Sequence, residues 1–162
     1  MGSWGRVLLV SAVLLAGCTS GQPATPDGAP ATGTSAGCGS RVETGALPDW
    51  ADAGFSGDAR VPHVFGAKGD IVAVLFGHPL TQVRRDGSNN KILWVPRPAP
   101  TSSDTLAITA TLDGTDTRVA REVAGGPGPS IIDLPQAGCW HLELRWAGHT
   151  DTMALVYAEQ LP

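Results

Sequence analysis

The sequence has little charge and few aromatic side chains, and only two of its eleven cationic residues are lysine. Its net charge of −4 excludes a protein that works mainly by neutralising phosphates, so we expect no nucleic-acid partner. No apolar run reaches the roughly 18 residues that a transmembrane helix requires. Glycine and proline are abundant instead, with 21 and 13 of the 162 residues. The length fits one domain and a tail.

The first residues have the pattern of a secretory signal. A short segment ends at Arg6, and residues 7–15 form an apolar stretch that is too short to span a bilayer comfortably. Residues 15–18 read Leu-Ala-Gly-Cys, which is the order of residue types in the bacterial lipobox. We interpret residues 1–17 as a lipoprotein signal peptide. An ordinary signal peptide with a chance cysteine is the alternative.

Cys18 would then take a diacylglyceryl group and become the new N-terminus. Two acyl chains give stable attachment to a membrane, whereas one chain gives marginal binding. We therefore expect the protein to be lipid-anchored at the extracytoplasmic face of the cell membrane, with the membrane as its partner through Cys18.

Residues 18–37 are predicted to be the lipidated cysteine and a disordered linker. Residues 19–37 contain no aromatic and no branched aliphatic side chain, so they cannot bury enough apolar surface to offset the entropy of ordering. Such a coil spans roughly 25 Å, and roughly 60 Å when fully stretched. Its threonine, serine and proline content also permits O-glycosylation, and an unmodified spacer is an equal alternative.

From Cys38 onward the hydrophobic pattern has a period of two, which predicts strands. In residues 139–146 the tryptophans and leucines alternate with polar side chains, as in a half-buried strand. Residues 105–112 and 152–157 alternate in the same way, whereas 71–76 and 92–95 are apolar on both faces and predict central strands. Further strands are expected at 118–123 and 130–134, a helical turn at 47–55, and large core residues at Phe76, Trp94, Trp140, Trp146 and Tyr157.

Turn-forming residues separate these segments, notably at 86–90, 113–114, 125–129, 135–138 and 148–149. About seven to eight short strands at roughly ten-residue spacing favour an all-β domain over residues 38–162, built as an antiparallel β-sandwich. A chain of this length is large enough for one hydrophobic core.

The cysteines fit an exported protein. With Cys18 lipidated, Cys38 and Cys139 remain, and such a pair is most simply a disulfide. The bond would close a loop of about 100 residues and tie the start of the domain to its last-but-one strand. Cys139 shares its phase with the outward residues of that strand. Either a bulge or the incoming N-terminal segment must therefore meet it on the outward face.

Motifs of common enzymes are missing, namely the Gly-x-Ser-x-Gly elbow, Cys-x-x-Cys, His-Glu-x-x-His and the P-loop. The glycines around Gly126 alternate with prolines, which indicates a rigid loop rather than a phosphate cradle. We therefore expect no enzyme and no cofactor. A hydrolase would need residues from distant loops to converge, and a substrate screen would address it.

The histidines are the metal candidates. His141 faces outward and His149 lies in the adjoining turn, with Asp151 two residues further on, so the three are a conceivable zinc or copper site. Isolated surface histidines are commoner than ligands, so we assign no metal and keep this set as the alternative. His63 and His78 adjoin prolines and look like loop residues.

Two further charged clusters have ordinary explanations. Asp49 and Asp52 are spaced as residues that cap a helix start. Residues 84–86 (Arg-Arg-Asp) lie at a hairpin end, where they could hold an anionic partner, although a solvated turn is the default.

The segments Lys-Ile-Leu-Trp-Val (91–95), Gly-Pro-Gly-Pro-Ser (126–130) and Ala-Gly-Cys-Trp-His-Leu (137–142), followed by 146–157, resemble a group of uncharacterised actinobacterial lipoproteins. The resemblance covers about residues 47–157. It implies an immunoglobulin-like sandwich outside the cytoplasm and brings no catalytic residues. The Cys and Trp are adjacent, unlike the spacing of true immunoglobulin domains, so the likeness concerns architecture alone.

The leading hypothesis is a lipid-anchored cell-envelope lipoprotein whose sandwich binds an envelope protein or a ligand without catalysis. Its binding surface is expected in the loops at residues 82–90 and 125–129, because sandwich domains present loops at their ends. The alternative is an extracytoplasmic metal or small-ligand binding protein that uses His141, His149 and Asp151.

Overall fold

The computed structural model describes residues 38–52, 54–55, 58–84, 87–97 and 103–159. The signal peptide, the lipidated cysteine and the linker predicted in residues 1–37 lie outside the described residues. Within the described part, no helix is long and apolar enough to cross a membrane. The elements in chain order are α1 (Asp49–Asp52), β1 (His63–Phe65), β2 (Ile71–Leu75), β3 (Leu80–Thr81), β4 (Lys91–Pro96), β5 (Leu106–Leu112), β6 (Arg118–Val123), β7 (Pro129–Ile131), β8 (Gly138–Trp146) and β9 (His149–Ala158).

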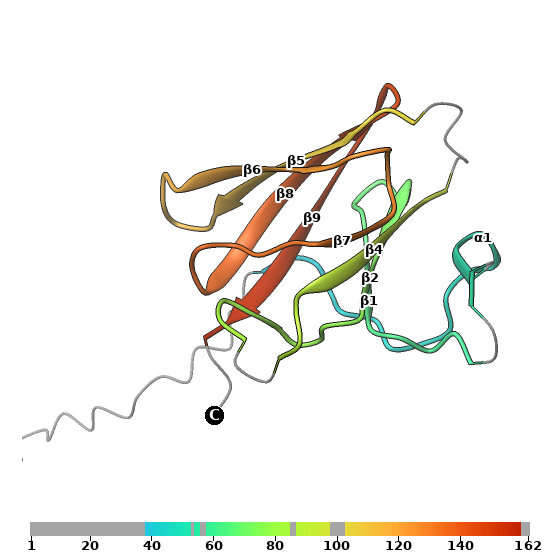
Figure 1. The fold of residues 1–162 in the computed structure, drawn as a ribbon, viewed down its shortest axis with the longest axis horizontal. Helices are drawn as coiled ribbons and strands as arrows, with labels where there is room; N and C mark the ends of the chain where they lie inside the picture. The colour runs from blue at the N-terminus through green and yellow to red at the C-terminus, as the bar shows by residue number, and fades with distance from the viewer. Residues whose placement is uncertain (1–37, 53, 56–57, 85–86, 98–102, 160–162) are drawn as a thin grey trace, which may run out of the picture. The chain divides into compact units, whose positions relative to one another are not determined.

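The strands form two sheets (Figure 1). Sheet A has the order β1-β2-β4-β7, and sheet B has the order β3-β9-β8-β5-β6. All neighbouring strands are antiparallel except β3 and β9, which are parallel. The prediction of an all-β, mainly antiparallel domain is therefore confirmed. The nine strands exceed the predicted seven to eight because β1 and β3 have only three and two residues, too few to show an alternating pattern.

One hydrophobic core lies between the sheets and is built by the alternation in the sequence. In β5 every second residue from Leu106 to Leu112 is buried, and in β8 and β9 the tryptophans, leucines and Tyr157 point the same way. Trp94, Trp140, Trp146 and Tyr157 are core residues, as predicted.

The prediction that Phe76 belongs to the core is wrong. Its side chain is 49% exposed. Leu75 points into the core, so the next residue along the chain points out of sheet A, where the Phe76 ring stacks on Phe55. Because this stretch of the sequence is apolar on both faces, it does not show to which side of the sheet Phe76 points.

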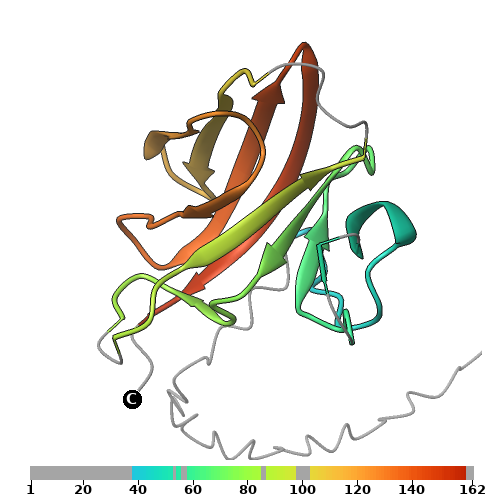
Figure 2. The ribbon, with the colours of Figure 1, turned by 45° about the vertical axis from the view of Figure 1, so that its right-hand side comes forward.

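The outer face of sheet A carries a second apolar cluster. Val72 and Val74 of β2 are fully buried there, beneath Leu47 and Ala51 from the segment that contains α1. Figure 2 shows this segment beside sheet A, on the side away from sheet B. The continuous burial of β2 explains why its sequence is apolar on both faces, and α1 lies in the predicted helical turn.

Candidate functional site

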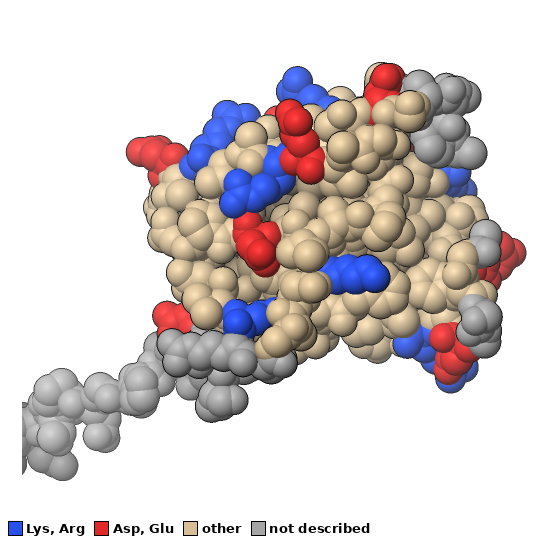
Figure 3. Space-filling view, in the orientation of Figure 1, with Lys and Arg blue, Asp and Glu red and all other residues tan. Residues whose placement is uncertain are grey.

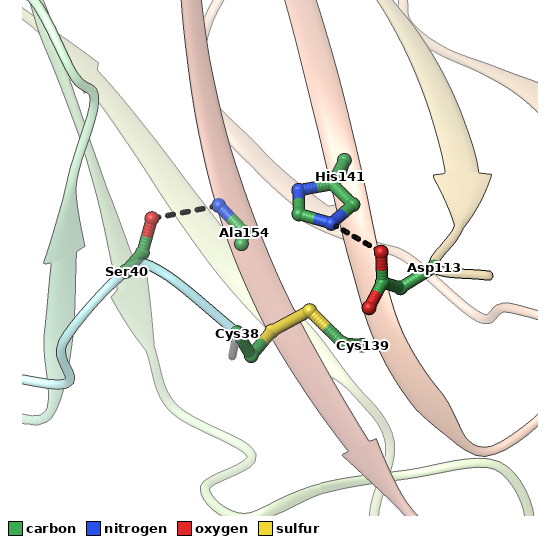
Figure 4. Close-up of a disulfide and its surroundings, with 6 residues drawn as sticks. All are labelled: Cys38, Ser40, Asp113, Cys139, His141 and Ala154. Carbon is green, nitrogen blue, oxygen red and sulfur yellow. Dashed lines mark hydrogen bonds and ion pairs between the residues drawn. A yellow bond between two sulfur atoms is a disulfide. The ribbon is translucent and has the colours of Figure 1, made fainter. Parts of the chain in front are cut away.

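The N-terminal segment of the domain crosses the outer face of sheet B (Figure 4). Cys38 forms the predicted disulfide with Cys139, with their Cα atoms 5.5 Å apart. Two residues later, the Ser40 hydroxyl accepts a hydrogen bond from the Ala154 amide of β9 at 2.7 Å. Cys139 and Ala154 are buried although both lie on the outward face. The incoming segment, rather than a bulge, therefore meets Cys139.

Strand register sets the side chains of this outer face in three rows across β6, β5, β8 and β9. Neighbouring strands lie about 4.8 Å apart, so residues in one row are adjacent. The first row is Arg118, Thr111, His141 and Ala154; the second is Ala120, Thr109, Glu143 and Thr152; the third is Glu122, Ala107, Arg145 and Thr150.

The first two rows and the crossing segment enclose a hollow of about 540 Å³. Gly39 and Ser40 form one side of it, and Arg118 of β6 stands on the other. Small side chains in the rows form the bottom of the hollow, and the crossing segment stands above them on one side. The hollow is lined by Gly39, Ser40, Ala67, Thr109, Thr111, Arg118, His141, Leu142, Glu143, Thr152, Met153 and Ala154.

Charges around the hollow are balanced. The Glu143 carboxylate lies 3.9 Å from the Arg118 guanidinium and accepts hydrogen bonds from Arg145. His141 Nε2 lies 3.2 Å from the Asp113 carboxylate (Figure 4). These pairs are solvent-exposed, so each contributes little to stability. On the face shown in Figure 3, acidic and basic side chains are likewise interspersed.

Three threonine hydroxyls line the hollow and are not used by the protein. Thr109, Thr111 and Thr152 each point outward from their strands. Among the described residues, none of these three hydroxyls has a hydrogen-bond partner. The hollow thus offers hydroxyl donors and acceptors, an imidazole, a guanidinium and a carboxylate to a ligand.

The structure does not bring the predicted metal candidates together. His141 pairs across the strands with Ala154, whereas His149 pairs with Trp146, so the two histidines are roughly 17 Å apart along β8. His149 stacks on the Trp146 ring with a centroid distance of 5.6 Å. In the described part of the chain, no three His, Cys, Asp or Glu side chains are grouped as metal ligands.

Asp151 has a different role. Its side chain is fully buried, and its carboxylate accepts hydrogen bonds from the backbone amides of Lys68 at 2.9 Å, Asp70 at 3.1 Å and Thr152 at 2.7 Å. Asp151 therefore holds the turn between β1 and β2, because a buried carboxylate must be satisfied by donors. Asp151 pairs with Leu144 on the inner face of sheet B, whereas His141 lies on the outer face, so closeness of Asp151 to His149 in sequence did not make a shared site.

The other two histidines differ from each other. His63 was expected in a loop, but it is a buried residue of β1 whose Nδ1 lies 2.8 Å from the Val61 carbonyl oxygen. His78 does lie in the loop between β2 and β3, and partial burial lowers its pKa from the ordinary value. Neither belongs to the hollow.

Each of the two loops predicted as binding surface connects a strand of sheet B to a strand of sheet A. The loop at residues 82–90 leads into the start of β4, whereas Gly128 accepts a hydrogen bond from the Trp94 amide further along that strand. Arg84 donates to the Asn90 side chain at 2.9 Å and to the Gly77 and Pro79 carbonyls of the loop between β2 and β3. Its guanidinium is therefore engaged by its own loop and by the loop between β2 and β3; Arg85 and Asp86 lie outside the described residues.

Asn90 fixes the loop from inside. Its buried amide group donates to the Thr81 carbonyl at 2.8 Å and to Asp133, and its oxygen accepts from the Thr81 amide. Asp49 and Asp52 lie in the first turn of α1, where negative charge suits the helix dipole.

Sequence reasoning identified the outward direction of Thr109, Thr111 and Glu143 but did not combine them into a site. Period-two alternation shows which face a side chain takes, but it does not show which strands are neighbours. Arg118 reaches the hollow only because β6 pairs with β5 at the edge of sheet B.

The fold and the hollow together define an all-β domain with two facing sheets and a polar, charge-balanced depression on one outer face. No protein-family model matches the sequence, and neither a curated protein nor a solved structure matches the chain.

Proposed function

We propose that the protein is a lipid-anchored lipoprotein of the cell envelope whose domain binds an envelope protein or ligand without catalysis. The lipobox ending at Cys18 supports the anchor, and the Cys38–Cys139 disulfide supports an oxidising compartment, since such bonds persist outside the cytoplasm. Residues 1–17 act as the signal peptide in this proposal, and residues 18–37 as the tether of residues 38–162.

The finer fold class is part of the proposal. We infer an immunoglobulin-like sandwich of the kind found in the actinobacterial lipoproteins that the sequence resembles. Two facing sheets of four and five strands support this class. The disulfide differs from the immunoglobulin pattern, because it joins a crossing segment to the outer face of one sheet rather than the two sheets to each other.

The hollow on the outer face of sheet B carries the binding proposal. Its free threonine hydroxyls and its Arg118–Glu143 pair can exchange hydrogen bonds with a partner at little cost, because the charges are already balanced and exposed. A partner with mixed donors and acceptors fits this surface better than a strongly charged one.

Affinity purification of the tagged full chain from detergent-solubilised membranes tests the proposal. We expect a component that is recovered with the wild type and with the control Arg97→Ser, which removes an exposed cation away from the hollow. Recovery should fall at least about tenfold with Arg118→Ser combined with Thr111→Val, a loss of roughly 1.4 kcal/mol or more in binding. Equal recovery with all three chains, or no recovered component, contradicts the proposal.

A further inference from the structure

We propose that one end of the domain, called the basal end here, rests on the lipid bilayer to which the chain is anchored. The basal end is where β2 and β9 finish and where β4 and β8 begin. β3 connects the two sheets there, because it follows β2 closely and pairs with Tyr157 and Ala158. Figures 1 and 2 draw β3 and the end of β9 on the lower side. The inference rests on the proposed lipid anchor.

The exposed apolar side chains of the described residues gather at this end. Across the outer face of sheet A, Phe76 lies opposite Lys91, and Lys91 pairs with Ile131, so the three form one row. Phe76 is 49% exposed and Ile131 is 55% exposed. The Lys91 ammonium stands 5.4 Å from the Phe76 ring centroid. Such a row of apolar groups beside an amphipathic lysine is suited to the headgroup boundary of a bilayer.

The remaining exposed residues of this kind are at the same end. Val83 follows Gln82, whose amide donates to the Ala158 carbonyl at the end of β9. Val156 pairs with Cys139, and Val42 lines a small apolar pocket together with Val156. All five large hydrophobic side chains that are exposed in the described chain therefore surround the basal end: Val42, Phe76, Val83, Ile131 and Val156. Scattered apolar residues need no explanation, but a set confined to one end of the domain indicates a contact surface.

The tether joins the domain at the same end. Cys38 is fixed by its disulfide to Cys139, which opens β8 and lies one residue from the pairing of Gly138 with Tyr157. A coil of the length predicted for residues 19–37 spans roughly 25 Å. A lipid on Cys18 therefore holds the basal end nearer to the bilayer than the opposite end, where Lys68 and Asp70 lie in the turn before β2.

Charge does not drive this contact. The described cations at the basal end, Arg41, Arg84, Lys91 and Arg121, lie among the acidic residues Glu43, Asp133 and Glu159, so this end has no strong excess of one sign. We therefore expect apolar insertion that is independent of anionic lipid and of salt, because only charged surfaces are screened.

Depth-dependent quenching in vesicles tests the inference. The lipidated full chain is reconstituted into phosphatidylcholine vesicles that contain a lipid brominated in its acyl chains. Phe76→Trp places a reporter at the basal end, and His149→Trp, also at an exposed aromatic position, is the matched control at the opposite end. The lipidated chain starts at Cys18 and keeps four native tryptophans, which give the same background in both variants.

We expect the fluorescence added by Phe76→Trp to be quenched about twofold, as for a side chain at the headgroup boundary, and that added by His149→Trp to be unchanged. Ile131→Ser should reduce the quenching, and 1 M salt should not. Equal quenching of the two reporters, or none at Phe76→Trp, would overturn the inference. Intact mass tests the anchor separately. If Cys18 carries no lipid, the anchor proposal fails. The quenching of the unlipidated variants is then measured in excess vesicles, which tests the contact of the basal end alone.

Discussion

Asp151 is a single carboxylate that organises the turn between β1 and β2. It is fully buried and accepts three backbone hydrogen bonds, two of them from Lys68 and Asp70 across the sheets. The chain can approach this carboxylate so closely because residue 66 is glycine: a Cβ atom there would lie 2.1 Å from an Asp151 oxygen.

Gly66→Ala should therefore destabilise the domain by about 1–3 kcal/mol, since the backbone or Asp151 must move and its hydrogen bonds must lengthen. Urea unfolding followed by tryptophan fluorescence measures the change. Gly39→Ala is the control, because a Cβ at Gly39 meets no atom within 4 Å, and it should stay within about 0.5 kcal/mol of the wild type. Equal stability of the two variants would contradict this role.

Tyr157 gives the domain a pH dependence in the alkaline range. Its hydroxyl donates to the Ile132 carbonyl at 2.6 Å, and burial, followed by the nearby Asp133 charge, raises its pKa above the ordinary value of 10.0. The folded state therefore holds this proton more tightly than the unfolded state does. The resulting stabilisation is complete below pH 10 and is lost as the pH rises above it.

Tyr157→Phe should cost about 1–2 kcal/mol at neutral pH, because it leaves the Ile132 carbonyl unpaired. Between pH 10 and 11.5 the free energy of unfolding should fall more steeply for the wild type than for the variant. Brief urea unfolding at each pH measures both curves. Parallel curves would show that Tyr157 does not bind its proton more tightly in the folded state.

At the scale of elements, the disulfide holds a segment without regular structure against the outer face of sheet B. Its two cysteines are 101 residues apart in sequence, so reduction frees a long loop in the unfolded chain. Ser40 by itself accepts one hydrogen bond, from the Ala154 amide.

Replacing Cys38 and Cys139 together by serine should lower the free energy of unfolding by up to about 5 kcal/mol in the chain-entropy model. It should also speed hydrogen exchange at the Ala154 amide, because the crossing segment leaves β9. Ser40→Ala is the control for the hydrogen bond alone and should cost about 1 kcal/mol. Unchanged exchange at Ala154 in the double variant would show that the segment stays in place without the disulfide.

Sequence patterns predicted the long elements well and the short ones poorly. β5, β8 and β9 alternate over seven to ten residues, which is enough to show both strand and facing. β3 has two residues and exists only because β9 pairs with it in parallel, which is a long-range contact. Phe76 was wrongly placed in the core for a related reason. β2 is buried on both faces, so its apolar sequence does not show at which residue the burial of the outer face ends.

At the scale of the whole molecule, the proposed anchor depends on one sulfur. Cys18→Ser should abolish the mass increase of a diacylglyceryl group and release the protein from vesicles on flotation, because no lipid remains to hold it. Intact mass of the membrane-extracted chain measures both the lipid and the Cys38–Cys139 bond. A wild-type mass that includes residues 1–17 and lacks the lipid would contradict the anchor.

The two proposed surfaces lie on different parts of the domain and use different chemistry. The hollow on sheet B is polar, with threonine hydroxyls and paired charges, whereas the basal end is surrounded by valines, Phe76 and Ile131. If the basal end rests on the bilayer, the rows above it on sheet B stand clear of the lipid and can meet a partner.

The sequence by itself determined the local properties of the chain: the strand-forming alternation, the turns, the lipobox pattern and the pairing of two remaining cysteines. These follow from neighbouring residues and from counting. Only the tertiary structure decided that Asp151 is a buried cap rather than a metal ligand, that three threonines share a hollow with Arg118, and that five exposed apolar residues surround one end. Each of these depends on which strands are neighbours and in what register, and long-range pairing leaves no trace in local periodicity.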